Sequence, residues 1–204
     1  MHRTFPKGRE EKRQVLLQAV ECVRDTLLAG ADEAEASATL PPATVQALDG
    51  AGLFALKLPT VLGGAEADLV TQLEILEAVT YIDTSAGWCT LIGAAAIAGP
   101  GAFLADEAVA QIFAGGQVPR AAGAFMPSGQ AIPVDGGYRV SGRWAFASGI
   151  RHAQWVTATA RVVRDGTTPP AVRRVVMPVA DVQIHDNWQV MGLQGTESCD
   201  FSVT

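Results

Sequence analysis

The sequence carries little charge and few side chains that bind metals. Of its 204 residues, 18% are charged, and the formal net charge is −6. A mildly acidic chain is a poor candidate for binding DNA or RNA, because such binding depends on neutralising phosphate charges. The three histidines are scattered, without the spacing of metal ligands, so we expect no metal site.

Cysteines, long apolar runs and phosphate-binding motifs are also scarce. The three cysteines lie far apart and form no CxxC pair, which favours buried or free thiols in a reducing compartment. The longest apolar run, Leu91 to Leu104, is interrupted by Gly99-Pro100-Gly101 and is shorter than the roughly 20 residues of a membrane span. The N-terminal residues show no secretory signal, and no GxGxxG or P-loop motif is present. We therefore expect a cytoplasmic protein without a membrane segment or a Rossmann-type dinucleotide site.

The first half of the chain has the periodicity of helices. Apolar residues recur on one face of each expected helix. The expected ranges are 10–29, 43–49, 69–79, 84–98 and 106–115. Pro42 can open the second helix, Asp68 is the expected N-cap of the third, and Thr84 or Ser85 is the expected cap of the fourth. Asp106 is expected to begin the last.

The second half changes to the alternation and β-branched composition of strands. Strands are expected over 138–141, 155–163, 172–177 and 182–184, with a turn at Arg164-Asp165-Gly166. Helices first and strands second indicate an α+β protein, with a helical domain over residues 1–117 and an antiparallel β-domain over 118–204. Residues 199–204 read as the start of a strand with no turn after it. A sheet that stopped there would expose an unpaired edge, so we expect either a fragment or a partner that covers this edge.

The segment 136–149, Gly-Gly-Tyr-Arg-Val-Ser-Gly-Arg-Trp-Ala-Phe-Ala-Ser-Gly, is the most informative part of the chain. It reads as a strand with a glycine turn, two large rings and a small hydroxyl residue. Trp144 and Phe146 alternate with alanines, so both rings are expected on one face of the strand. Core packing is the expected role of Trp144, whereas Phe146 suits either the core or a binding site. Such a segment can place an aromatic wall and a hydroxyl donor beside a flat, partly polar ring system.

Three motifs in order resemble the acyl-CoA dehydrogenase superfamily. They are Ala51-Gly52-Leu53-Phe54 in the helical half, Tyr138-Arg139-Val140-Ser141-Gly142 in the strand, and Gly192-Leu193-Gln194-Gly195-Thr196-Glu197-Ser198 near the end. The resemblance implies the family's N-terminal helical domain and middle β-domain. The usual C-terminal four-helix domain has no counterpart here.

The version of the flavin-contact strand found here, residues 142–149, is most similar to the flavin-dependent hydroxylase branch. The resemblance therefore implies a monooxygenase that uses reduced flavin, as FAD or FMN, and O2 on a small-molecule substrate. A flavin reductase partner and a homo-oligomer are also implied. Two alternatives stay open, an acyl-CoA dehydrogenase that uses FAD and a truncated, non-catalytic binding or partner subunit.

The resemblance also implies roles for particular residues. Ser148 is expected to donate a hydrogen bond to flavin N5 and is the one candidate catalytic residue. Phe146 and Ala147 are expected beside the ring system, and Trp88 in the substrate pocket. The segment Phe125-Met126-Pro127 is expected to line the pyrimidine end of the flavin through backbone groups. His152 follows the Ser148 turn closely enough to be tested, although an exposed or strand-end histidine is the simpler interpretation.

Overall fold

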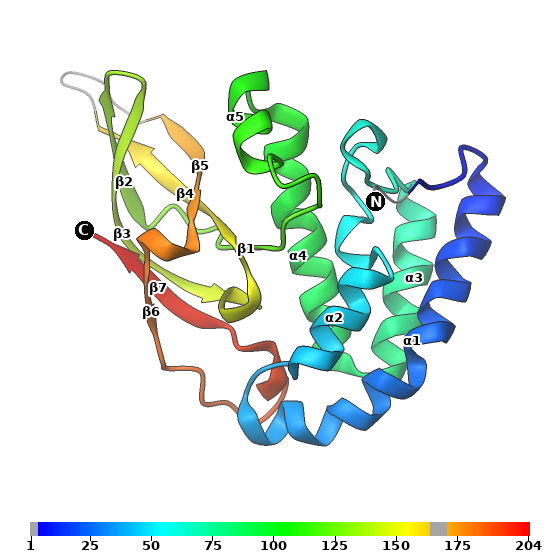
Figure 1. Ribbon diagram of the computed structural model, residues 1–204. Coiled ribbons are helices and arrows are strands. Elements are labelled where there is room, and N and C mark those ends of the chain that lie inside the picture. Colours follow the sequence, from blue (N-terminus) through cyan, green and yellow to red (C-terminus); the bar gives the residue numbers. More distant parts are fainter. Residues whose placement is uncertain (1–3, 164–170) are drawn as a thin grey trace.

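The computed structural model describes residues 4–163 and 171–204, and it consists of a helical part followed by a sheet (Figure 1). The helices are α1 (Arg9–Ser37), α2 (Pro42–Gly50), α3 (Leu69–Ile82), α4 (Thr84–Phe103) and α5 (Asp106–Ile112). Two 3-10 turns, η1 (Leu53–Ala55) and η2 (Thr60–Leu62), join α2 to α3. The five expected helices are confirmed, and α1 continues further than predicted, to Ser37.

Two aspartates begin α3 and α4 by accepting hydrogen bonds from backbone N–H groups that the helix leaves free. The Asp68 carboxylate accepts from the Val70 and Thr71 N–H groups, which confirms the predicted cap of α3. The Asp83 carboxylate accepts from the N–H groups of Ser85 and Ala86 at 2.7 and 3.1 Å. The prediction of a cap at Thr84 or Ser85 was therefore wrong by one residue, because the preceding carboxylate is the stronger acceptor.

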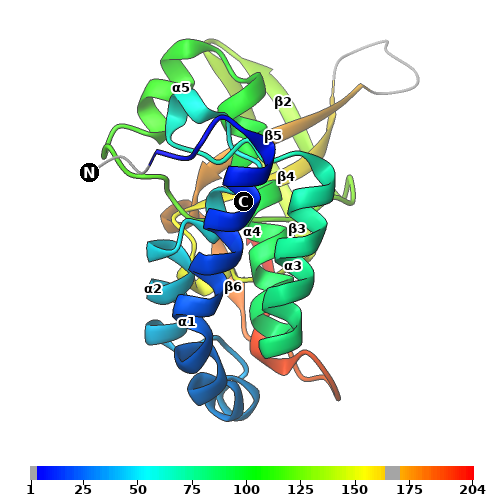
Figure 2. The same cartoon turned by 90° about the vertical axis from the view of Figure 1, so that its right-hand side faces the viewer.

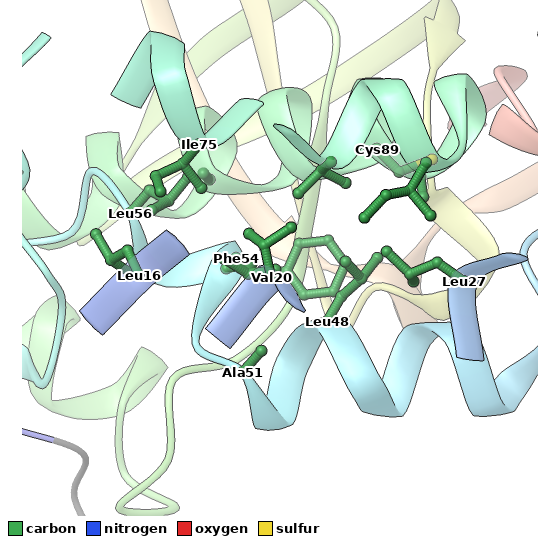
Figure 3. Packing of buried hydrophobic residues seen from close by; sticks show 14 of the residues in the cluster. Leu16, Val20, Leu27, Leu48, Ala51, Phe54, Leu56, Ile75 and Cys89 are labelled. Carbon is green, nitrogen blue, oxygen red and sulfur yellow. The ribbon is translucent and has the colours of Figure 1, made fainter. Parts of the chain in front are cut away.

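The helical part is held together by one apolar core (Figure 3). Leu16, Val20 and Leu27 lie on one face of α1 and are all buried. Together they span about three turns of the helix. Phe54 of η1 lies between this face and α4, where Gly93 leaves room for its ring; a Cβ at Gly93 would lie 2.9 Å from a Phe54 ring carbon. This close approach holds η1 against α4, the helix that also contacts the sheet.

Helix α4 stands between α1, α2 and α3 on one side and the sheet on the other (Figures 1 and 2). It packs on α3 and α1 on one side and on β1 and β4 on the other. By length and composition alone it could cross a membrane, yet half of its most apolar window is buried inside the protein. The position of α4 between α3 and β1 makes it a core helix of this protein.

A seven-stranded mixed sheet follows the helices. Its strands are β1 (Ala121–Gly123), β2 (Gly129–Val134), β3 (Gly137–Ala147), β4 (Trp155–Val162), β5 (Val172–Pro178), β6 (Gln183–His185) and β7 (Cys199–Val203). The 3-10 turns η3 (Ile150–His152), η4 (Val179–Asp181) and η5 (Gln194–Thr196) lie in the connections. The turn expected at Arg164-Asp165-Gly166 lies outside the described residues.

The strand order is β1-β4-β2-β3-β7-β6, with β5 paired to β4. Strand β4 runs parallel to both β1 and β2, and the other pairs are antiparallel. The predicted order, a helical part followed by a β-part, is confirmed, but the sheet is mixed and not antiparallel throughout. No hairpin joins β3 to β4; instead η3 carries the chain across, so that β4 enters on the other side of β2 and in the same direction.

The last strand is not an edge. β7 pairs with β3 on one side and with β6 on the other, so the expectation of an unpaired edge at 199–204 was wrong (Figure 1). The sequence predicted β6 as a strand, but it did not predict that β6 pairs with β7. The two-sided pairing also places Ser198, the residue before β7, against the end of β3.

Strand β3 changes partner half-way along its length. Its first half pairs with β2 up to Ser141, and its second half pairs with β7 from Gly142 onward. Gly142 has φ +150°, and a Cβ there would lie 2.6 Å from the Cα of Gly129. Only glycine fits this crossing of two backbones. The bend carries the end of β3 toward α4, where the candidate site lies.

Candidate functional site

A cavity of about 410 Å³ lies between α4 and the end of β3. Rings and small apolar residues make up most of its wall, with three hydroxyl side chains at one end. Four of its large apolar residues are partly open to solvent: Trp88 (41%), Phe125 (61%), Met126 (72%) and Phe146 (67%). Large apolar side chains gathered at an exposed concave surface are typical of a ligand-binding site.

Five of the residues predicted for the site line this cavity together. Trp88 comes from α4, Phe125 and Met126 come from the loop after β1, Phe146 comes from β3, and Ser148 comes directly after β3. Two predicted residues do not line it. Ala147 is fully buried behind the wall in the core of the sheet, and Pro127 follows the lining residue Met126 without contributing to the wall.

A bulge in β3 separates the two rings that the alternation had placed on one face. The register with β7 shifts between Trp144 and Ala147. Trp144 is fully buried, stacks on Phe201 at 5.2 Å and donates from Nε1 to the Thr159 carbonyl, so its predicted core role is confirmed. Phe146 points into the cavity instead, so the common-face prediction was wrong. A bulge adds one residue and thereby reverses which side chains face the core.

Phe146 has φ +64°, the left-handed region, which is uncommon for a bulky residue. Its ring meets the edge of Trp188 at a centroid distance of 6.2 Å and an interplanar angle of 80°. Across the cavity, the guanidinium carbon of Arg174 lies 4.4 Å from the centroid of the Phe125 ring. Edge-to-face and cation–π contacts of this kind fix both rings at the cavity mouth.

The polar end of the cavity is a hydrogen-bonded chain that begins at the Trp88 indole of α4 and continues through three hydroxyl groups. The Trp88 indole Nε1 donates to the Ser148 Oγ at 2.9 Å. The Ser148 Oγ lies 2.7 Å from the Ser198 Oγ, which in turn lies 2.8 Å from the Thr196 Oγ1. The Thr196 hydroxyl donates to the Leu193 carbonyl at 2.9 Å. All three hydroxyl residues are buried, yet each lines the cavity.

The direction of the first hydrogen bond decides what Ser148 can do. An indole N–H only donates, so the Ser148 oxygen must accept from Trp88 and its one proton remains free to be given elsewhere. That proton can go to Ser198 or to a ligand acceptor in the cavity. Because the Thr196 hydroxyl donates to the Leu193 carbonyl, it accepts from Ser198, and Ser198 accepts from Ser148. A ligand acceptor would therefore take the proton that Ser148 otherwise gives to Ser198. The cavity therefore contains one hydroxyl donor that its own neighbours prepare for a ligand.

Eight lining residues were not predicted for the site, and four of them lie in the segment 188–198: Trp188, Leu193, Thr196 and Ser198. The motif 192–198 had been recognised as part of the family resemblance, but no role was attached to it. The missing information was the pairing of β7 with β3, which brings Ser198 beside Ser148 although 50 residues separate them. Sequence spacing does not reveal such a contact.

His152 lies away from this cavity, behind the turn that follows Ser148. Its ring packs beside Phe54 at a centroid distance of 6.0 Å, and its backbone carbonyl accepts from Arg120. Burial, with the nearby Arg120 charge as a second cause, lowers the pKa of His152 from 6.5 to about 4. The ring is therefore neutral at physiological pH. It is part of the packing between the helices and the sheet.

Comparison with known proteins agrees with this geometry. Residues 9–113 match the sequence profile of the family described as "Acyl-CoA dehydrogenase, N-terminal domain". The chain belongs to the acyl-CoA dehydrogenase superfamily. It is 33% identical over 193 residues to a pigment production hydroxylase of Rhodococcus erythropolis, covering 92% of this chain and 49% of that protein.

Other relatives place this superfamily member with the flavin-dependent monooxygenases. It is 31% identical over 186 residues to the flavin-dependent monooxygenase oxygenase subunit HsaA of Mycobacterium tuberculosis, covering 91% of this chain and 46% of that protein. A crystal structure of the M. tuberculosis HsaA monooxygenase superposes with a TM-score of 0.86 at 30% identity, over 94% of this chain and 50% of the other.

A second structure, XiaF from Streptomyces sp. in complex with FADH2 and glycerol, superposes with a TM-score of 0.87 at 27% identity, over 96% of this chain and 49% of the other. The chain thus spans about half the length of the relatives that it matches.

The cavity suits a flavin ring system. Gly123, Ala124 and Ala145 leave its walls thin, so a flat ring can approach the backbone of β1 and β3. Phe146 and Trp88 present aromatic surfaces, and Ser148 presents a hydrogen-bond donor. The fit to a flavin ring therefore rests on the thin walls, the two aromatic surfaces and the hydroxyl donor at the polar end of the cavity.

Proposed function

We propose that this chain supplies the flavin-contact half of a hydroxylating monooxygenase that uses reduced flavin and O2. The observation that carries the proposal is the Trp88–Ser148 hydrogen bond at the end of an apolar cavity. Because Ser148 accepts from Trp88, it can donate its own proton to an acceptor such as flavin N5, in competition with Ser198. The hydroxylase and monooxygenase names of the relatives support the reaction class.

The roles follow from the wall of the cavity. Reduced flavin, when bound, supplies the reaction with O2, and the protein supplies position, one donor and the exclusion of water. Ser148 would hold a proton at N5, and Phe146 would cover one edge of the ring. Phe125, Met126 and Pro127 would border the pyrimidine end through their backbone. Trp88 would both orient Ser148 and border the substrate.

Further parts of the proposal rest on the relatives. We infer a separate flavin reductase as partner, because relatives are named as oxygenase subunits or components. The cofactor is FAD or FMN, since neighbouring structures contain FADH2 or FMN. We place the boundary between the helical and β-domains at residue 117, and we propose a homo-oligomer in the cytoplasm.

The first experiment measures flavin binding to the purified chain. Wild-type protein is titrated with FMN and FAD, oxidised and reduced, under anaerobic conditions and followed by flavin fluorescence and absorbance. We expect saturable binding, and we expect Ser148→Ala to weaken it roughly two- to tenfold, the effect of one hydrogen bond. Ser141→Ala, on the same strand but outside the cavity, should leave the affinity unchanged. Equal affinity of the wild-type and Ser148→Ala proteins would remove Ser148 from the site.

The second experiment separates the reaction classes. Protein loaded with reduced flavin is mixed rapidly with O2, and the absorbance is followed. A long-lived oxygenated flavin, shortened by Ser148→Ala, supports the monooxygenase. Slow, featureless reoxidation together with bleaching of oxidised flavin by an acyl-CoA would instead indicate a dehydrogenase. Absence of flavin binding would indicate a non-catalytic subunit.

A further inference from the structure

Glu197 is an unusual residue for its place in the fold. Its side chain is 1% exposed, and its backbone has φ +50°, a left-handed conformation that glycine adopts far more easily. It lies between η5 and β7, directly before Ser198. A bulky, ionisable residue that is both buried and in this conformation requires contacts that hold it there.

Those contacts join three separate segments. The Glu197 carboxylate accepts hydrogen bonds from the hydroxyl of Thr39, in the connection after α1, and from the backbone N–H of Arg151 in η3. The Arg151 Nε lies 3.8 Å from the same carboxylate, and its guanidinium also pairs with Asp186 at 2.7 Å. Burial raises the pKa of Glu197, while the Thr39 and Arg151 hydrogen bonds and the Arg151 charge lower it in part. The carboxylate is therefore retained in the interior by its partners.

We call Glu197 with its partners Thr39 and Arg151 the clamp, and it connects the segments at the polar end of the cavity. Arg151 follows Ser148 by three residues, and Ser198 follows Glu197 directly, so the carboxylate links the two short segments that carry the paired hydroxyls. The same turn is joined a second time, because Gly149 N–H donates to the Thr196 carbonyl at 2.9 Å. Thr39 attaches this unit to the helical part, which also carries Trp88.

We propose that Glu197 is a positioning residue for the Ser148 hydroxyl: its hydrogen bonds to Thr39 and Arg151 hold Ser148, Ser198 and Trp88 in register at the end of the cavity. The functional meaning rests on the proposed role of Ser148 toward flavin, but the geometric effect does not. Glu197 touches neither hydroxyl, and it acts through the backbone segments that it ties together.

The test uses the indole N–H signals of the tryptophans in nitrogen-15 NMR spectra, which need no flavin. The sequence has four tryptophans, so four signals are expected, and Trp88→Phe assigns the relevant one. Ser148→Ala gives the position of the Trp88 signal without its acceptor. Trp144, whose indole donates to the Thr159 carbonyl inside the sheet, serves as the internal reference.

Three variants of Glu197 and its partner discriminate the possible causes. Glu197→Gly relieves the backbone strain and removes the clamp, so the Trp88 signal should move toward its Ser148→Ala position while the Trp144 signal stays. Glu197→Gln keeps an acceptor for Arg151 and an amide for Thr39, so the wild-type signal should be retained. Thr39→Val removes one donor at the helical side, and it should move the Trp88 signal less, in the same direction.

A matched control is available elsewhere in the chain. Glu66 also has a left-handed backbone, at φ +43°, and its carboxylate also accepts from a threonine, through the N–H and hydroxyl of Thr60. It is exposed and does not line the cavity. Glu66→Gly should therefore leave the Trp88 signal unchanged.

The outcomes decide the proposal in either direction. A Trp88 signal that stays in place in Glu197→Gly overturns it. So does an equal displacement in Glu197→Gln, because the charge and not the hydrogen bonds would then be responsible. If Glu197→Gly fails to fold, Thr39→Val decides, and an unmoved signal there refutes the clamp. In flavin titrations Glu197→Gly should weaken binding by about the factor seen for Ser148→Ala, at most about tenfold; a displaced signal without weaker binding would leave the clamp intact and remove only the flavin role of Ser148.

Discussion

Phe146 offers the sharpest test, because its backbone strain and its ring can be separated by two substitutions. An L-residue in the left-handed region costs about 1–2 kcal/mol relative to its ordinary conformation. Phe146 bears this cost at φ +64° while its ring is 67% exposed, so burial of the ring returns little. Strain that persists at the wall of a cavity points to a functional reason for the residue.

We predict that Phe146→Gly is more stable than Phe146→Ala by about 1 kcal/mol. Both variants lose the ring and its edge contact with Trp188, so this loss cancels in the comparison. Alanine keeps the strain, whereas glycine removes about 1–2 kcal/mol of it and loses about 0.5–1 kcal/mol through the greater freedom of its unfolded chain. For a chain of this size, 1 kcal/mol corresponds to about 2–4 °C in Tm.

Urea denaturation followed by circular dichroism measures the difference directly, provided that the m-values agree. Flavin affinity is an independent measurement. Both variants remove the same ring, so both should weaken flavin binding equally. An alanine variant as stable as the glycine variant would show that residue 146 is not held in the left-handed region. Unweakened flavin binding in both would show that the ring is no wall of a flavin site.

Two further predictions concern stability alone. As pH falls from 6.5 to about 4, an unfolded chain protonates His152 but the folded protein does not, so His152 should lower the free energy of unfolding by up to about 3 kcal/mol across this range. His152→Phe should show a correspondingly smaller loss in urea titrations between pH 7 and 4, and parallel curves would contradict the buried, neutral ring. Gly129→Ala places a Cβ 2.0 Å from the Trp144 ring and should cost about 1–3 kcal/mol. Gly137→Ala meets nothing within 4 Å and should be neutral or slightly stabilising in the same urea titrations.

The sequence predicted those parts of the fold that depend on local chemistry. Helical periodicity and the Asp68 cap act within a few residues, so the helices of the first half were predicted in order. The sheet depends on pairings between distant segments, and these were predicted less well. The parallel placement of β4 and the two-sided pairing of β7 follow from how η3 and β6 return the chain, which no local pattern records.

The same difference between local patterns and long-range pairings explains which parts of the candidate site were predicted. Ser148 and Phe146 were predicted from one contiguous motif, but the bulge that turns Phe146 away from Trp144 comes from the register with β7. Ser198 and Thr196 belong to a motif that was recognised without a role, and only tertiary structure shows that they extend the hydroxyl chain from Ser148. No role for Glu197 could be predicted from the sequence, because its left-handed backbone and its two partners, Thr39 and Arg151, are visible only in the folded chain.

One stripe of α4 runs along the cavity from its polar end toward the contact between helix and sheet. Trp88 and Ile92 line the cavity, while Ala96, one turn further, packs 3.5 Å from where a Gly123 Cβ would lie. From Trp88 to Ala96 the helix rises roughly 12 Å, a length that matches the long axis of a three-ring system. The small residues Ala96 and Gly123 let helix and sheet approach closely one turn beyond Ile92. The hydroxyl groups of the cavity gather at the Trp88 end, and a ring system bound along this stripe would have to turn its hydrogen-bonding edge toward Ser148.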